Sequence, residues 1–326
     1  MTQTFQSLPT KNTKAGKPRR VGFEVEFSNL SFNKTQSVMK QCLGGEFGQG
    51  SVAEQILNVP ELGEFNIELD WNFLKRKASE DNNNDQTPEW LSQLAQASEW
   101  LVPMEIVCPP IEVASLDKLS TLIEQLREAG AQGTEESPIA AYGVHINTEI
   151  TVLEPTLIHN YLRAFGLLQW WLVESNEVNF SRKLSPYIDL FSEEYLLEIM
   201  SKTTVDMDTL FDDYLAHNPT RNRALDMLPM LAEINQERVF SVVDDPKIKA
   251  RPAFHYRLPN CLIDDPNWSL QQVWELWLVV ETLANNEHGL NQLCEAFVSQ
   301  KSSWFGGRRK AWTEYIDAWL KDQELA

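Results

Sequence analysis

An α+β fold, in which an antiparallel sheet packs helices on its apolar face and leaves a polar face open, is predicted by three features of this 326-residue chain. Several short segments alternate strictly between apolar and polar residues, which is typical of half-buried strands. A turn at residues 60–63 leads into one of these segments, as in a hairpin. Longer segments with apolar residues at helical spacing lie between and after the strands, so helices and strands are mixed.

The first predicted strand covers residues 19–28 and carries paired carboxylates. Apolar residues occupy every second position from Val21 to Phe27, so Glu24 and Glu26 share the opposite face. Same-face neighbours on a strand are roughly 7 Å apart, and carboxylates at that separation repel each other unless they are solvated or bridged by cations. Hard divalent ions prefer such oxygen ligands. Taken alone, the pattern is equally typical of a strand with a solvated acidic face.

Four further segments repeat this arrangement of polar groups opposite an apolar face. They cover residues 65–70, 100–108, 141–150 and 253–258. If the five strands share one sheet, its open face collects Glu24, Glu26, Glu68, Asp70, Glu105, His145, His255 and Arg257. Such a face suits a polyphosphate, because acids ligate Mg²⁺, each metal bridges phosphate oxygens and arginine neutralises developing charge. Within this set, a solvated charge is the favoured interpretation of Glu68.

No P-loop, kinase signature or dinucleotide fingerprint offers another way of binding a nucleotide. The glycine-rich cluster at residues 44–50 lacks a downstream Lys-Ser/Thr pair and leads into strand-like residues, which favours a loop over a phosphate cradle. Trp71, beside Asp70, is a candidate for lining a substrate pocket or stacking on adenine. Arg19 and Arg20 are expected to end the first strand in solvent.

Helices are predicted over residues 34–43, 87–98, 115–129, 155–173, 193–201, 207–216 and 223–235, and three more are predicted after residue 269. Together with the strands they predict a single elaborated domain over residues 19–326, whose C-terminal helical part covers about residues 269–326. Residues 1–18 are polar and are expected to be disordered. The stretch 75–87 is expected to be a mobile surface loop.

Composition narrows the possible partners. The formal net charge of −19, from 28 basic and 47 acidic residues, argues against nucleic acid, because binding a phosphate backbone needs a basic footprint. The four cysteines are widely spaced without a CxxC pair, so we expect small buried hydrophobic residues in a reducing cytoplasm. Neither an apolar leader nor an uncharged run of the ~18 residues that a membrane span needs is present, so no membrane partner is expected.

Five short motifs resemble, in their order along the chain, those of the amidoligase family. They are Gly22-x-Glu24-x-Glu26, the hairpin ending in Asp70, Glu105-Ile106-Val107-Cys108-Pro109-Pro110, Gly143-Val144-His145-Ile146-Asn147, and Tyr256-Arg257. That family belongs to the superfamily of carboxylate-amine ligases that includes glutamine synthetase and glutamate-cysteine ligase. The similarity spans about residues 19–260. Five motifs in the right order, each on a predicted strand face, are considerably more specific than any one of them.

The resemblance implies a curved antiparallel sheet with helices on its convex face and a polar concave face that binds ATP with Mg²⁺ (or Mn²⁺) ions. It also implies a reaction in which ATP phosphorylates a substrate carboxylate, an amine attacks the acyl phosphate, and an amide and ADP leave. The substrates would be small-molecule or peptide carboxylates and amines, and a homo-oligomer is compatible with the family.

The site residues are carried over one by one from the matching motifs. The implied metal ligands are Glu24, Glu26, Asp70, Glu105 and His145. Arg257 would stabilise the transferring phosphoryl group or the tetrahedral intermediate. Arg182, in a Ser-Arg loop like one in relatives, and more weakly Arg223 would contact substrate or phosphate.

Three motifs depart from the family pattern. Asp-Gly-Ser is Asp70-Trp71-Asn72 here, His-Val-His is His145-Ile146-Asn147, and Glu-Phe-Arg is His255-Tyr256-Arg257. The last departure is the most serious, because the family glutamate ligates a metal, whereas a neutral His255 would ligate Mn²⁺ or Zn²⁺ better than Mg²⁺. Two alternatives to a ligase therefore stay open: a catalytically altered binding or assembly protein with the same fold, and a metal-dependent phosphohydrolase. His255 is equally compatible with a hydrogen-bonded strand histidine.

Overall fold

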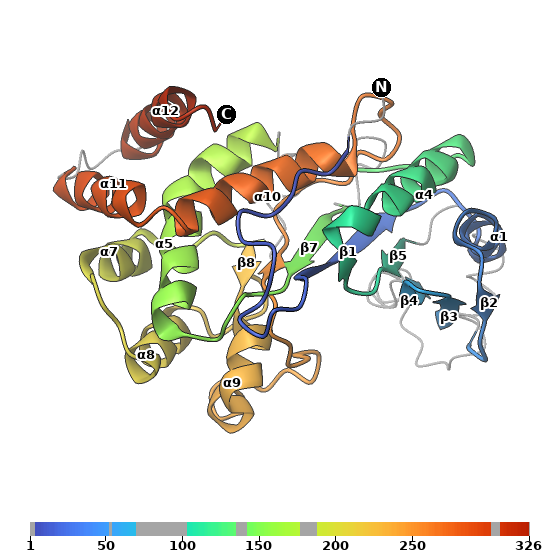
Figure 1. Ribbon diagram of the computed structural model, residues 1–326, viewed down its shortest axis with the longest axis horizontal. Coiled ribbons are helices and arrows are strands. Elements are labelled where there is room, and N and C mark those ends of the chain that lie inside the picture. Colours follow the sequence, from blue (N-terminus) through green and yellow to red (C-terminus); the bar gives the residue numbers. More distant parts are fainter. Residues whose placement is uncertain are drawn as a thin grey trace, which may run out of the picture.

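A computed structural model describes residues 4–51, 54–69, 103–134, 142–176, 188–300 and 307–325 (Figure 1). Asp70, Trp71 and Arg182 lie outside these residues, as do the predicted loop 75–87 and the predicted helix 87–98. Among the described residues, no helix combines the length and the apolar character that crossing a membrane requires.

Among the described residues, one nine-stranded sheet forms the centre of the fold, in the order β2-β3-β4-β5-β1-β7-β9-β8, with β6 also pairing with β1. All of its registered pairs are antiparallel, which confirms the predicted antiparallel sheet; the curvature stays a prediction. The strands are β1 Arg20–Phe27, β2 Glu46–Phe47, β3 Glu54–Val59, β4 Gly63–Leu69, β5 Met104–Val107, β6 Ile111–Glu112, β7 Val144–Thr148, β8 Leu225–Asp226 and β9 His255–Tyr256.

Helices lie around this sheet, and α4 and α10 lie on the opposite side of the strands from α9 (Figure 1). The helical elements are α1 Phe32–Leu43, the short 3₁₀ helix η1 Val113–Ser115, α4 Asp117–Glu128, α5 Pro155–Ser175, α7 Glu193–Ser201, α8 Met207–His217, α9 Leu228–Phe240, α10 Leu270–Ala284, α11 Glu287–Ser299 and α12 Gly307–Asp322. The three helices predicted after residue 269 are thus α10, α11 and α12.

The apolar face of β1 packs into the core. Its alternate residues from Val21 to Phe27 are each at most 2% exposed. Val25 packs in the same hydrophobic core as leucines of α4, including Leu119 and Leu122, and lines a small cavity with them. The amphipathic pattern of α4 explains this packing, because its buried residues recur three or four positions apart. The other face of β1, with Glu24 and Glu26, is thereby directed away from the α4 side.

The chain enters β1 through a buried ion pair. Both Nη atoms of Arg19 donate to the Glu281 carboxylate on α10, at 3.0 and 2.8 Å, and the Tyr161 hydroxyl donates to it at 2.6 Å. The expectation that Arg19 lies in solvent is wrong, because this residue is only 1% exposed. Two carboxylate oxygens with several donors offset the cost of burying the guanidinium charge.

Two other segments differ from the sequence-based expectation. Residues 4–18 lie against the domain: Leu8 is 2% exposed, and the Trp274 indole donates to the Gln6 carbonyl at 2.8 Å. The predicted helix 223–235 instead begins with strand β8, and α9 starts only at Leu228. Pro229 explains the shift, since proline is tolerated in the first turn of a helix but not inside it.

Candidate active site

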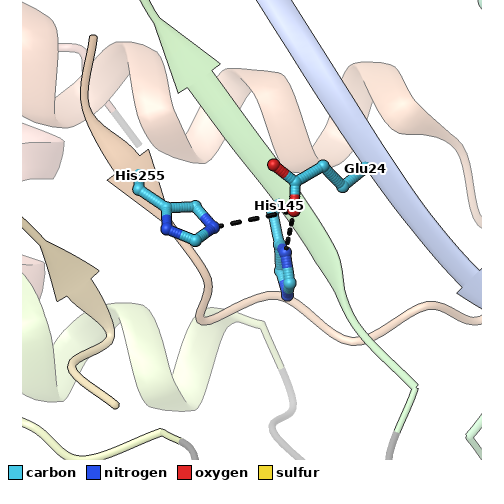
Figure 2. Close-up of side chains that lie close together, drawn as sticks. All are labelled: Glu24, His145 and His255. Carbon is cyan, nitrogen blue, oxygen red and sulfur yellow. Dashed lines mark hydrogen bonds and ion pairs between the residues drawn. The ribbon is translucent and has the colours of Figure 1, made fainter. Parts of the chain in front are cut away.

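The candidate site lies on the polar face of the sheet, where β5, β1, β7 and β9 bring acidic and imidazole groups together. In the register of the strands, Glu24 is paired with His145 of β7, and Glu26 is paired with Glu105 of β5. His255 comes from β9, which is hydrogen-bonded to β7. Figure 2 shows the side chains of Glu24, His145 and His255 converging from these three strands.

Glu24 is the most heavily bonded acid of the site. Its Oε2 lies 2.7 Å from His145 Nδ1, and its Oε1 accepts a hydrogen bond from Asn147 at 2.8 Å. Burial by itself would raise the pKa of Glu24, but the attraction of His255 and the hydrogen bond of His145 outweigh it, so this pKa lies well below its ordinary value. Glu24 is therefore a carboxylate and an acceptor only.

His145 is a neutral imidazole with a defined tautomer. Burial lowers its pKa, although the hydrogen bond to Glu24 opposes the shift. The low pKa values of Glu24 and His145 are compatible, because a neutral ring can still donate its Nδ1–H to an ionised carboxylate. Since Nδ1 carries the proton, the lone pair of His145 is on Nε2, which lies 3.8 Å from Glu26 Oε1. The other oxygen of Glu26 accepts the Gly143 backbone N–H at 2.7 Å.

The imidazole of His255 contacts, through Nδ1, a carboxylate that the sequence analysis did not single out. Its Nδ1 lies 3.3 Å from Oδ2 of Asp226, a fully buried residue of β8. Asp226 Oδ1 in turn accepts the Leu228 N–H at the start of α9. The sequence signal for Asp226 is its position just before a helix start that contains proline, where acidic side chains accept backbone hydrogen bonds. His255 Nε2 is buried without a hydrogen-bond partner in the described ranges, 3.7 Å from Glu24 Oε2.

A row of glutamates crosses the neighbouring strands. Glu54 is paired with Glu68, Glu68 with Glu105, and Glu105 with Glu26. Directly opposed like charges destabilise a sheet. Burial, and then the charges of Glu24, Glu26 and Glu68, raise the pKa of Glu105 well above its ordinary value. Cations beside the row would let all of its carboxylates ionise.

Glu68 belongs to this row rather than to a freely solvated surface. It is half-buried, and burial followed by the charge of Glu54 raises its pKa, which Lys249 and Lys247 partly offset. The sequence-based expectation that Glu68 is a solvated charge did not take the partner strand into account, because the register that places Glu105 opposite Glu68 is a property of the tertiary structure.

In the part of the chain that the structure describes, two groups of side chains have the donors and the proximity to hold a metal ion. One contains Glu24, His145 and His255, and the other contains Glu26, Glu105 and His145; in each, the candidate ligand atoms lie within 4.8 Å of one another. Carboxylate and neutral imidazole donors fit a divalent cation. His145 is common to both groups, and a neutral imidazole has one lone pair, so it serves one ion at a time.

The positively charged candidates occupy different places. Arg257 follows β9 and donates to the Arg221 carbonyl at 2.6 Å, and its charge helps to lower the pKa of His145. Arg223 donates to the carbonyls of Leu190 and His217, at 3.2 and 2.9 Å, so its contact with substrate stays a prediction.

Arg251 is a cation of the site that the sequence analysis did not single out. It donates to Asn147 at 2.8 Å and lies 3.8 Å from Glu24 Oε1. No motif marks it, because it precedes the last strand within a loop.

Comparison with known proteins identifies a family that matches this chain. Residues 17–279 match the family model described as "Putative amidoligase enzyme", a range that contains β1, β5, β7, β8 and β9 and therefore both donor groups. The comparisons with curated proteins and with solved structures found no match. Because the family model covers most of the 326 residues, the chain belongs to the amidoligase family.

Proposed function

We propose that this protein is an ATP-dependent carboxylate-amine ligase that forms an amide through an acyl phosphate. The observation that carries the proposal is the row of opposed carboxylates on a sheet face that also holds His145, within a chain of the amidoligase family. Opposed acids weaken a sheet, so their placement in register calls for cations that a nucleotide would bring.

Electrostatics restrict how a nucleotide can approach this face. The phosphates of ATP carry negative charge, and so do the carboxylates of the acidic row, on a chain whose formal net charge is −19. Divalent ions between them would reverse the repulsion and stabilise the charge that develops on the transferred phosphoryl group. Nucleotide binding is therefore expected to depend strictly on Mg²⁺ or Mn²⁺.

The side chains divide the remaining work between holding and orienting. Glu26 and Glu105 would hold the ion that the nucleotide brings, with the Gly143 N–H fixing the Glu26 carboxylate at 2.7 Å. Arg257, beside His145, would stabilise negative charge on the phosphoryl group or on the tetrahedral intermediate. A substrate carboxylate would take the γ-phosphoryl group with release of ADP. The amine would then displace phosphate and lose a proton, which leaves the amide.

The test is a turnover assay of the purified protein with ATP, Mg²⁺ or Mn²⁺, and a panel of carboxylic acids and amines. Amine-dependent ADP release with a new amide detected by mass spectrometry is the expected result. Phosphate release without amide would instead indicate a metal-dependent phosphohydrolase, and no turnover would indicate a binding or assembly protein.

A matched pair of variants links turnover to the site. Glu26→Gln keeps the shape of the side chain but removes its charge and should abolish turnover. Glu64→Gln, on an exposed residue of β4, should leave turnover unchanged. Equal activity of both variants would contradict the role of the acidic row.

A further inference from the structure

Glu24, His145 and His255 differ from the acidic row in the chemistry of their donors. Two of the three are imidazoles, whereas Mg²⁺ favours oxygen ligands. The resemblance implies a glutamate at the position of His255, which would give two carboxylates and one imidazole. With His255 the set holds one carboxylate and two imidazoles, so it has one negative charge fewer. These donors therefore do not suit the Mg²⁺ ion that the family resemblance implies.

A buried ring nitrogen and a carboxylate oxygen face each other inside this group. His255 directs Nδ1 at the carboxylate of Asp226, so Nε2 is the ring nitrogen that it presents to the group. That buried nitrogen lies 3.7 Å from Glu24 Oε2 and has no hydrogen-bond partner among the residues described. His255 is only 4% exposed, so water does not freely satisfy the nitrogen. A divalent ion between this nitrogen and the carboxylate would satisfy both groups.

We infer that Glu24, His145 and His255 form a site for a divalent transition-metal ion of the Zn²⁺ or Mn²⁺ type, with Asp226 as the residue that positions His255. The inference deepens the proposed function and rests on it for the ion's place beside the nucleotide, but its test needs no turnover. Among these ions Zn²⁺ should bind more tightly than Mn²⁺, following the general order of affinities for nitrogen and oxygen ligands.

The distances suit such an ion. Ligands about 2.1 Å from a metal are roughly 3.0–3.4 Å apart in octahedral or tetrahedral geometry. The observed separations from Glu24 Oε2, 2.7 Å to His145 Nδ1 and 3.7 Å to His255 Nε2, bracket that range. The two rings meet edge to face with centroids 5.2 Å apart, so both nitrogens reach the space beside Glu24 (Figure 2).

Binding of an ion changes the proton positions: any proton on His255 Nε2 is released to solvent, and the proton of His145 changes nitrogen. Binding through His145 Nδ1 requires the proton now on that nitrogen to move to Nε2, which lies 3.8 Å from Glu26 Oε1. His255 keeps its Nδ1 proton on Asp226, the arrangement by which carboxylates commonly orient metal-bound imidazoles. An ion here also takes His145 away from the group with Glu26 and Glu105.

Metal binding to the chelator-treated full-length protein tests the inference, by calorimetry with Zn²⁺, Mn²⁺ and Mg²⁺ in the absence of nucleotide. His255→Gln should weaken Zn²⁺ binding by more than about 100-fold, and Asp226→Asn by about 10–100-fold, the loss typical of an outer-shell partner. His255→Glu, which restores the family carboxylate, should lower the ratio of Zn²⁺ to Mg²⁺ affinity.

The matched control is His217→Gln. The Nε2 atom of His217 lies 2.9 Å from a carboxylate oxygen of Glu198, away from the proposed site, so this pair offers Zn²⁺ an alternative imidazole and carboxylate. It should leave the affinity unchanged. Zn²⁺ binding that survives His255→Gln, or that depends on His217, would overturn the inference, because both outcomes place the ion elsewhere.

X-ray absorption of the Zn²⁺-loaded wild type keeps the inference testable if a variant does not fold. Two imidazole ligands are expected, and fewer than two would refute the site. A protein that binds Zn²⁺ through His255 but forms no amide would refute the ligase proposal alone. Amide formation without His255-dependent Zn²⁺ binding would refute the inference alone.

Discussion

Replacing Glu105 by glutamine should stabilise the metal-free protein and weaken its response to divalent ions. Glu105 stands directly opposite Glu26 on one side and Glu68 on the other. Each directly opposed like-charge pair costs about 0.2–1 kcal/mol, so neutralising the central member should increase the unfolding free energy by about 0.4–2 kcal/mol at neutral pH. Most substitutions lower stability, so an increase is diagnostic.

The pH dependence follows from the direction of the Glu105 pKa shift. Its pKa is raised in the folded state, so the folded protein binds more protons than the unfolded chain at pH values between the ordinary and the raised pKa. Stability therefore falls as pH rises through the ordinary value of 4.5 towards the raised one. Below this window both states are protonated, and the advantage of Glu105→Gln should vanish.

Urea unfolding followed by the fluorescence of the 11 tryptophans measures this effect, in chelator and in Mn²⁺, over a range of pH. Mn²⁺ should stabilise the wild type, and more so at higher pH, but should stabilise the Glu105 variant less. Glu64→Gln is the control and should respond as the wild type does. A variant that is less stable than the wild type in chelator at neutral pH, or that still gains fully from Mn²⁺, would refute the reasoning.

Three further predictions concern other parts of the fold. Glu281→Gln should lower the unfolding free energy by about 3–5 kcal/mol, because it leaves Arg19 as a buried charge without its counterion. Chemical denaturation measures this change. The exposed ion pair of Glu154 with Lys14 is the control, and its loss should cost at most about 1 kcal/mol. Arg251→Gln should weaken nucleotide binding in Mg²⁺ with little loss of stability, because Arg251 is a partly exposed cation beside the acidic face; unchanged affinity in calorimetry would contradict this. Cys294 should resist alkylation in the native protein, since burial raises its pKa to about 11, and rapid labelling at neutral pH without unfolding would show the opposite.

Local patterning predicted much of the fold. The alternation of residues 21–27 correctly separated a buried face from the face that carries Glu24 and Glu26, because a strand has only two faces. Helix ends were predicted closely where caps mark them, as at Ser192 before α7 and Asp206 before α8.

Local patterning was less reliable where the same residues suit two structures. Ala224, Leu225 and Met227 are apolar residues that fit a helix or a strand. The choice of strand β8 depends on pairing with β9, about thirty residues later in the chain. Arg19 likewise appeared to be a surface charge, because its partner Glu281 is 262 positions away.

The sequence by itself determined that this chain carries acidic and imidazole groups on the polar faces of several strands, and that their order resembles the amidoligase family. Periodicity and short motifs are local properties, so they are readable without coordinates. Only the tertiary structure decided that Glu26, Glu105 and Glu68 stand in one row and that Asp226 supports His255. Those relations depend on strand order and register, which are set by packing between segments far apart in the chain.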